Sequence, residues 1–543
     1  MAVAAAAMAP ALLAGRAGGD AGTAPGLAPV SARASESTAG EGKASESRPD
    51  TLAIYVGAEP AAGFDPLTGW GINGTTILFQ SRLLRFDKDM SLQPDLAESY
   101  EVSDDKITYT FHLRDGVKFS DGSNLTADDV AFSFLTARDN GAGKIDLTKL
   151  ADARATDDRT VVFTLSEPYS SFLYLAGKLG IVPKALYDAQ SYRENPAGSG
   201  PFKLLQWDKG QQVIVAPNEY YYGAQSAFRQ VTLLFLDPET ALANAQSGQL
   251  DVVMVQPEYA TAKVPGMSLQ TFETLDTRGF NLPCGKPEEK DGKQVGNAVT
   301  SDPAVRQALS IGIDRQAIIE AALNGIGTPS TTLLTSVPWA NPDIVFEDGR
   351  VDEAKKILDD AGWVPGTDGI RAKDGVRAAF TIRGDSGDLQ RYNIAVALAQ
   401  QAAQLGLEVT ARSAPWQECW DNASTDPNCW GTGDYDPAGD LVSYYASYGQ
   451  YNFCQYANDA VDEHVHEALD TTDQDVTLEQ WRQVQWDGST GPEGEQGDHP
   501  YLWVATIDHT YFVRDGLDLG EQPMHPHGHG WPVAMNLNEW RWK

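Results

Sequence analysis

The most informative part of the sequence for the fold reads Ile107-Thr-Tyr-Thr-Phe-His-Leu-Arg-Asp-Gly-Val-Lys-Phe-Ser-Asp-Gly122. Its first seven residues alternate between large apolar and smaller or polar side chains, as in a strand that buries one face. Asp115-Gly116 and Asp121-Gly122 then mark two turns, because glycine reaches the backbone angles that tight turns need. The stretch therefore predicts an antiparallel strand followed by closely spaced turns.

The flanking segments combine further strands with helices. Residues 51–57 form a short apolar run that predicts a buried strand, and residues 160–165 repeat the alternation. Thr126 and Asp129 supply a capping hydroxyl and an acid at the start of a helix. Apolar residues recur at helical spacing in three more segments, 304–311, 352–360 and 391–405, and a strand is predicted at 407–411. The pattern is mixed α/β without an internal repeat.

Length and charge limit the class of protein. The chain has 543 residues and a formal net charge of −34, which argues against nucleic acid or an anionic membrane as its main partner. A single core usually stops growing at about 250 to 300 residues, so we expect at least two lobes. No stretch reaches the roughly 18 apolar residues that a membrane span needs.

The N-terminal segment resembles an export signal. Residues 1–17 are small and apolar, and Leu12-Leu-Ala-Gly-Arg16 is similar to a bacterial lipobox in which the last residue would be a lipidated Cys. Arg16 takes that place, which leaves lipid anchoring open. Residues 18–50 hold Ala, Gly, Ser and Glu with almost no large apolar side chain, and we expect a disordered tether.

The four cysteines are Cys284, Cys419, Cys429 and Cys454. Four thiols are compatible with two disulfides in an exported protein and allow three pairings. We favour the short loop between Cys419 and Cys429. A zinc site is disfavoured because zinc ligands usually come in closely spaced pairs, whereas these gaps are long and irregular.

Eight segments in a fixed order carry a resemblance to one family. They are 92–103, 109–122, 198–202, 248–251, 302–315, 352–363, 430–437 and 456–462. From about Thr51 to Arg514 the chain resembles the solute-binding proteins of peptide and nickel ABC importers. The resemblance implies two α/β lobes of the class II periplasmic-binding-protein type, joined by hinge strands and enclosing a ligand. It also implies the following ranges: 51–85, 200–280 and 500–543 for the first lobe, 86–199 for an extra domain and 281–499 for the second lobe.

The same resemblance implies ligand contacts in both lobes. In dipeptide-binding members the acid of a Trp-Thr-Gly-Asp turn pairs with the α-amine of the ligand, and Trp430-Gly-Thr-Gly-Asp434 is one residue longer here. Asp434 is therefore a candidate, with a solvated turn aspartate as the alternative. Gly74, Thr75 and Thr76 match the first-lobe turn beside the ligand backbone, with an ordinary helix cap as the alternative.

Arginine and aromatic residues complete the expected ligand site. Members that bind a free carboxylate use an Arg near the start of a second-lobe helix, and Arg383 lies closest to that position, with Arg391 as the alternative. Eight aromatic residues fall between positions 416 and 451. Most of them would pack in the core, and we expect only Trp416, Trp430 and Tyr435 to contact ligand.

Three histidines near the C-terminus alternate with other residues. His525, His527 and His529 could ligate nickel, copper or zinc, because imidazole suits all three metals. The neighbouring Gly and Pro residues suggest a surface turn that binds metal weakly or not at all. A nickel site is therefore a second hypothesis.

The resemblance implies a non-catalytic, extracytoplasmic receptor. It would capture a short peptide and deliver it to a membrane permease that is driven by ATPase subunits on separate chains, and we expect a monomer. The alternative ligand is a nickel or other metal chelate. A copper oxidoreductase is a remote third hypothesis, and it is disfavoured because no Cys has a neighbouring His. A hydrolase is disfavoured separately, because the sequence motifs of hydrolases are absent.

Overall fold

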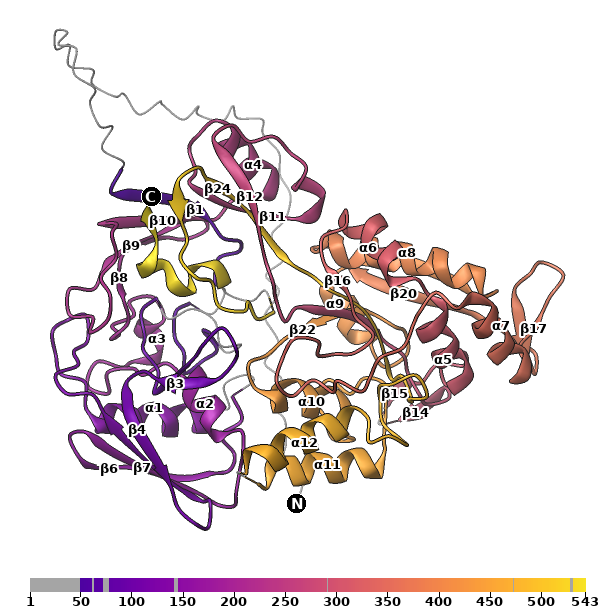
Figure 1. Ribbon diagram of the computed structural model, residues 1–543, viewed down its shortest axis with the longest axis horizontal. Helices are drawn as coiled ribbons and strands as arrows, with labels where there is room; N and C mark the ends of the chain where they lie inside the picture. The colour runs from indigo at the N-terminus through magenta and orange to yellow at the C-terminus, as the bar shows by residue number, and fades with distance from the viewer. Residues whose placement is uncertain are drawn as a thin grey trace, which may run out of the picture. The chain divides into compact units, whose positions relative to one another are not determined.

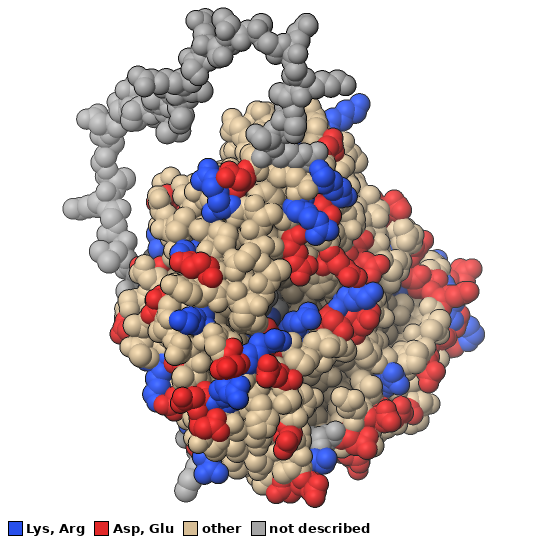
Figure 2. Space-filling view, turned by 60° about the vertical axis from the view of Figure 1, so that its left-hand side comes forward, with Lys and Arg blue, Asp and Glu red and all other residues tan. Residues whose placement is uncertain are grey.

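The structure is a computed structural model that describes residues 49–60, 63–71, 78–140, 145–290, 292–471, 473–527 and 531–543. The predicted leader and nearly all of the predicted tether lie outside these residues, as do Gly74, Thr75, Thr76 and His529. None of the helices in these ranges is long and apolar enough to cross a membrane. On the face shown in Figure 2, acidic side chains gather along the right-hand side with basic ones interspersed.

A seven-stranded sheet forms the first lobe (Figure 1). Its order is β12 (Met267–Phe272), β24 (His509–Arg514), β11 (Val252–Val255), β1 (Thr51–Tyr55), β10 (Gln230–Leu234), β9 (Gln212–Pro217) and β8 (Phe202–Asp208). The predicted strand at residues 51–57 is confirmed as β1, which runs parallel to β10 and β11, and the other neighbours are antiparallel. The lobe also holds α4 (Pro238–Gln246), η1 (Pro257–Tyr259) and η2 (Pro532–Glu539).

The extra domain, in indigo and purple in Figure 1, is built on a four-stranded antiparallel sheet. Its order is β4 (Ala97–Val102), β5 (Thr108–Leu113), β7 (Thr160–Leu165) and β6 (Leu150–Asp157). In β5 every second side chain is buried, which confirms the alternation predicted for residues 107–113. The helices are α1 (Ala127–Asn140), α2 (Phe172–Lys178) and α3 (Ala189–Tyr192).

A second sheet forms the centre of the second lobe. Its order is β16 (Thr328–Pro329), β23 (Tyr501–Thr506), β13 (Thr277–Asn281) and β22 (Cys429–Thr432). A parallel pair, β20 (Ala379–Asp385) and β21 (Glu408–Ala414), lies beside it. The helices of this lobe are α5 (Pro303–Gly312), α6 (Arg315–Leu323), α7 (Val351–Asp360), α8 (Leu389–Gln404), α9 (Trp416–Asp421), α10 (Pro437–Tyr445), α11 (Asp459–Leu469) and α12 (Gln474–Gln485).

The remaining elements are short strands. They are β2 (Leu84–Phe86), β3 (Leu92–Pro94), β14 (Glu288–Lys290), β15 (Lys293–Val295), β17 (Val364–Pro365), β18 (Arg371–Lys373), β19 (Val376–Arg377), β25 (Leu517–Asp518) and β26 (Arg541–Trp542).

Two segments cross between the sheets of the lobes, one from β12 to β13 and one from β23 to β24. They are tied together, because the Thr274 hydroxyl donates to the Ile507 carbonyl oxygen at 2.6 Å and the Ile507 amide donates to the Asp276 carbonyl oxygen at 2.9 Å. β13 and β23 pair within the second-lobe sheet although they fall in ranges predicted for the first lobe. The division into 51–85, 86–199 and the later ranges stays a prediction.

The predicted disulfide between Cys419 and Cys429 is wrong, since all four cysteines are free thiols. Cys429 lies on β22 within the apolar core of the second lobe, where burial raises the pKa of its thiol to about 12. The Cys419 thiol on α9 instead faces the Ala414 carbonyl oxygen at 3.8 Å. Spacing along the chain indicates only the length of a loop, whereas packing decides where each thiol points.

Candidate functional site

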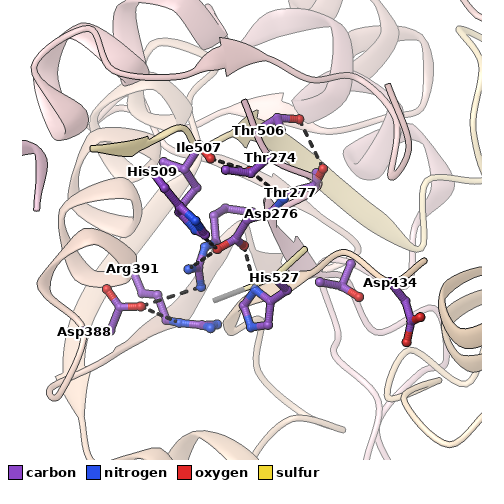
Figure 3. Close-up of polar contacts among 12 residues, drawn as sticks. Thr274, Asp276, Thr277, Asp388, Arg391, Asp434, Thr506, Ile507, His509 and His527 are labelled. Carbon is purple, nitrogen blue, oxygen red and sulfur yellow. Dashed lines mark hydrogen bonds and ion pairs between the residues drawn. The ribbon is translucent and has the colours of Figure 1, made fainter. Parts of the chain in front are cut away.

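A buried group of charged side chains surrounds Asp276 where the chain crosses between the lobes. The Asp276 carboxylate accepts a hydrogen bond from Nη2 of Arg278 at 2.9 Å and lies 2.7 Å from Nδ1 of His527. Nε2 of His509 lies 3.7 Å away (Figure 3). Burial alone would raise the pKa of Asp276, but Arg278 and His527 hold it well below its usual range. Asp276 is therefore an anion that holds Arg278 and His527 in place at the crossing.

Arg278 keeps donors that the described part of the chain does not satisfy. Its residue is 6% exposed, and its Nε and Nη1 atoms have no hydrogen-bond partner among the described residues. The nearest further acid is Asp388, whose Oδ2 lies 3.6 Å from Nη1. A side chain at Gly431 would collide with this guanidinium and with His527. Gly431 thus lets β22 approach Arg278 closely, and two N–H groups of a buried guanidinium stay available.

Arg391, in the first turn of α8, lies next to this group. Its Nη1 donates to the Cys429 carbonyl oxygen at 2.7 Å and its Nε donates to Asp388 at 3.0 Å. Its guanidinium carbon lies 5.1 Å from the ring centroid of Trp416, which is 40% exposed. Arg391 and Arg278 therefore share Asp388 and place two guanidinium groups side by side.

Arg383, the first choice from the motif order, has other partners. It pairs with Asp426 through Nη1, and its Nε lies 3.7 Å from Glu418. These contacts hold Arg383 to the loop before β22 and to α9. Of the two arginines that the sequence suggested, Arg391 is the one in contact with the Asp276 group through Asp388.

Asp434 lies just beyond β22 and points away from Asp276 (Figure 3). Its carboxylate oxygens lie 2.7 and 2.9 Å from Nζ of Lys178, the last residue of α2, and both side chains are 0% exposed. Oδ1 also accepts the Asp436 amide at 2.9 Å. The partner of Asp434 in this structure is therefore an ammonium group of the protein itself. Its pairing with the amine of a ligand stays a prediction.

Two more buried carboxylates accompany this pair. Asp440 accepts the Asp434 amide at 2.9 Å and the Thr432 hydroxyl. Asp436 accepts the Ser171 hydroxyl at 2.9 Å, and burial raises the pKa of its carboxyl to about 7 despite nearby Lys178. The turn after β22 thus concentrates acidic groups against the extra domain.

This turn also borders two cavities. Tyr435 lines one of about 580 Å³, together with Arg82 and other residues of the extra domain and first lobe. Asp436 lines another of about 550 Å³, between the extra domain and α10 and α11. Both volumes lie in the range of small-molecule sites.

The three predicted aromatic contacts differ in exposure. Trp430 is buried, stacks on Phe453 at 4.7 Å and donates from Nε1 to Asn281 at 2.8 Å. Tyr435 is buried, and its hydroxyl donates to the Met524 carbonyl oxygen. Trp416 alone presents a large exposed face. The ligand role of all three stays a prediction.

Two of the three C-terminal histidines, His525 and His527, lie within the described residues and face different partners. The Nδ1 atoms of His525 and His509 lie 3.2 Å apart. Burial, and to a smaller extent the nearby His509, holds the pKa of His525 well below its usual range. His527 instead faces Asp276. Within the described ranges no group of three or more His, Cys, Asp or Glu residues could hold a metal ion. Because His529 lies outside those ranges, the three-histidine site stays a prediction.

Sequence reasoning missed Lys178, Asp276 and Arg278. A signal was present for Lys178, which ends the apolar segment 172–177, because a charged residue is rarely buried there without a partner. Asp276 and Arg278 lie in a polar stretch that gives no such signal. Nothing in the sequence indicates which partner each one meets.

Comparisons with known proteins agree with this architecture. The family described as bacterial extracellular solute-binding proteins, family 5 Middle, matches residues 91–452. Protein XP55 of Streptomyces lividans is 34% identical over 488 residues, which cover 86% of each chain. The oligopeptide-binding protein AppA of Bacillus subtilis is 29% identical over 62% of this chain and 64% of its own.

Solved structures share the fold. NikZ from Campylobacter jejuni in complex with Ni(L-His) superposes with a TM-score of 0.76 at 24% identity, covering 91% of this chain and all of that one. AppA of Bacillus subtilis in complex with a nonapeptide gives 0.70 at 22% identity, covering 91% of this chain and 99% of that one. The predicted two-lobed α/β fold is confirmed.

Proposed function

The chain belongs to family 5 of the bacterial extracellular solute-binding proteins, which serve ABC importers and are not enzymes, and we propose that it captures short peptides. The peptide lies between the lobes, beside the crossing strands. Capture shifts the lobes toward a ligand-enclosing arrangement that a membrane permease recognises. The permease and its ATPases are separate chains, and the receptor acts as a monomer.

The observation that carries this proposal is the buried Arg278 guanidinium with two N–H groups that lack a protein acceptor. Leaving a buried donor unsatisfied costs about 1 to 3 kcal/mol, so a ligand oxygen that accepts from it gains affinity. A carboxylate fits best, because a charged acceptor makes a stronger hydrogen bond to a guanidinium than a neutral oxygen does. Arg391 strengthens the local positive field, and a free C-terminus supplies the carboxylate of a peptide.

The peptide backbone follows β22, between Arg278 and the turn at Asp434. Trp416 offers its exposed face to a ligand side chain, and Trp430 and Tyr435 support the site from the core. Gly74, Thr75 and Thr76 stay predicted contacts of the first lobe. The names of two relatives, the oligopeptide-binding AppA and the probable D,D-dipeptide-binding DdpA of Escherichia coli, favour a peptide ligand.

A metal chelate is the second candidate, because Arg278 requires a carboxylate whatever molecule carries it. An amino-acid complex of nickel brings carboxylates, and NikZ was solved with Ni(L-His). His525, His527 and His529 would then contribute a ligand to the metal.

Calorimetry with three ligands separates the candidates. We expect trialanine with a free C-terminus to bind at least tenfold more tightly than its C-terminal amide, because only the free acid brings a negative charge to the buried Arg278 guanidinium. Binding of nickel–histidine with no binding of either peptide would show that the ligand is a metal chelate and not a peptide. Equal affinity for acid and amide would contradict the role of Arg278.

A further inference from the structure

We infer that Lys178 stays paired with the Asp434 carboxylate when ligand binds. The receptor then selects ligands that place no free ammonium group beside Asp434. The inference rests on the proposed function, because it concerns the same ligand. It assigns the chemical class as short carboxylate ligands without a free α-amine, such as N-acylated peptides.

The geometry of the pair supports this assignment. Nζ of Lys178 lies 2.7 Å from Oδ1 and 2.9 Å from Oδ2 of Asp434, so it contacts both oxygens. Oδ1 accepts the Asp436 amide as well. A carboxylate offers about four acceptor positions, and the fold already uses three of them. A ligand ammonium would therefore have to displace Lys178 or share one anion with it.

Sharing is unfavourable because both side chains are 0% exposed. Two ammonium groups on one carboxylate repel each other, and the repulsion is strong where water does not screen it. The neighbouring acids do not offer a free substitute. Asp440 accepts from Asp434 and Thr432, and Asp436 accepts from Ser171 and the Ala438 amide at 3.1 Å.

Displacement is also opposed by the packing of α2. Gly177, directly before Lys178, lies against Phe86 and Leu92 so closely that an added Cβ would meet Phe86 at 2.9 Å. The Gly177 carbonyl oxygen accepts from Nη1 of Arg82 at 3.5 Å. The backbone that carries Lys178 is therefore fixed on both sides. Moving the ammonium group away would leave a buried cation and a buried anion unpaired.

The test compares trialanine with N-acetyl-trialanine by calorimetry on the full chain. We expect the wild type to bind the acetylated peptide at least as tightly as the free one. Lys178→Met frees Asp434, and we expect it to shift the preference toward the free amine by tenfold or more. Lys184→Met is the matched control, because Lys184 in the same domain makes only an exposed pair with Asp128 at 3.5 Å.

Two outcomes would overturn the inference. One is a wild type that binds the free amine tenfold more tightly than the acetylated peptide, and the other is an unchanged preference in Lys178→Met. If Lys178→Met does not fold, Asp434→Asn is tested in its place. The inference requires that Asp434→Asn keeps the wild-type ratio of affinities for the acetylated and the free peptide. If a ligand amine instead binds Asp434, the affinity for the free peptide should fall in this variant. A protein that binds neither peptide would instead contradict the proposed function.

Discussion

The two buried charged groups near the C-terminal end of β22, Lys178 with Asp434 and Asp276 with Arg278, differ in what they leave unsatisfied. In the first group Nζ of Lys178 contacts both carboxylate oxygens of Asp434, and neither side chain reaches solvent. In the second group Asp276 accepts from one nitrogen of Arg278, and Nη1 lies 3.6 Å from Asp388, but Nε and Nη1 make no hydrogen bond among the described residues. All four side chains are buried. The proposed ligand site therefore rests on unsatisfied donors rather than on buried charge as such.

The two groups also join different parts of the molecule. Lys178 and Asp434 tie the extra domain to the second lobe across 256 residues of sequence. Asp276 and Arg278 lie at the crossing between the lobes, with Thr274 and Ile507. The first group therefore joins the extra domain to the second lobe, whereas the second lies where the chain passes from one lobe to the other.

The largest effect should come from breaking the satisfied pair. Lys178→Met leaves Asp434 buried without a cation, and we expect the free energy of unfolding to fall by about 3 to 5 kcal/mol. Urea denaturation measures it. The double variant Lys178→Met/Asp434→Asn should recover most of the loss, because it removes the lone charge. A single variant within about 1 kcal/mol of the wild type would contradict a tight pair.

Removing the unsatisfied guanidinium should act on binding instead. Arg278→Gln is expected to weaken the binding of a free-acid peptide by about 2 to 4 kcal/mol and to change the affinity for its amide little. Calorimetry with both peptides measures the loss of affinity for the free acid and for the amide. Arg377→Gln is the control, since Arg377 makes only exposed pairs with Asp368 and Glu408. Equal losses for acid and amide would show that Arg278 supports the fold rather than the ligand.

The two groups should also respond to pH in opposite directions. Asp436, beside the Lys178 pair, has a folded pKa of about 7, so the folded protein keeps a proton that the unfolded chain releases above about pH 4. The stability that this proton contributes is lost as the pH rises toward 7 and beyond. Asp276 has a depressed pKa, so its contribution is present above about pH 4 and is lost as the pH falls.

Asp436→Asn isolates the first of these effects. Asparagine can still accept from Ser171 and the Ala438 amide, and it does not titrate. We expect the variant to gain roughly 1 to 3 kcal/mol over the wild type at pH 8, with little gain at pH 4. Urea denaturation at the two pH values tests this, and a gain that does not depend on pH would refute it.

The smallest effect concerns the exposed side of the Arg278 group. Trp416→Ala removes the ring beside Arg391, and we expect a loss of about 0.5 to 1 kcal/mol in the affinity for a free-acid peptide. Trp420→Ala is the matched control, because Trp420 is 41% exposed and contacts aromatic rings. If both variants lose the same affinity, the ring acts through packing and not through Arg391.

The fold that motif order predicted is confirmed, whereas the ligand contacts that it suggested stay predictions. The eight segments indicated a two-lobed protein, and the family match over residues 91–452 agrees. For the ligand carboxylate the same order favoured Arg383, yet Arg383 is held by Asp426 while Arg391 joins the Asp276 group through Asp388. The two arginines lie eight positions apart, and only the packing of α8 against β22 distinguishes them.

The sequence alone determined the local elements, because their causes lie within a few residues. The alternation at 107–113 specifies β5, and Asp302 begins α5 by accepting the Ala304 amide two residues ahead. Only the tertiary structure decided which charges neutralise one another. Lys178 could have met a ligand or solvent, and Asp434 could have been a turn residue. Their pairing depends on an interface between distant segments, since the energy of a buried charge is set by the groups that surround it in space.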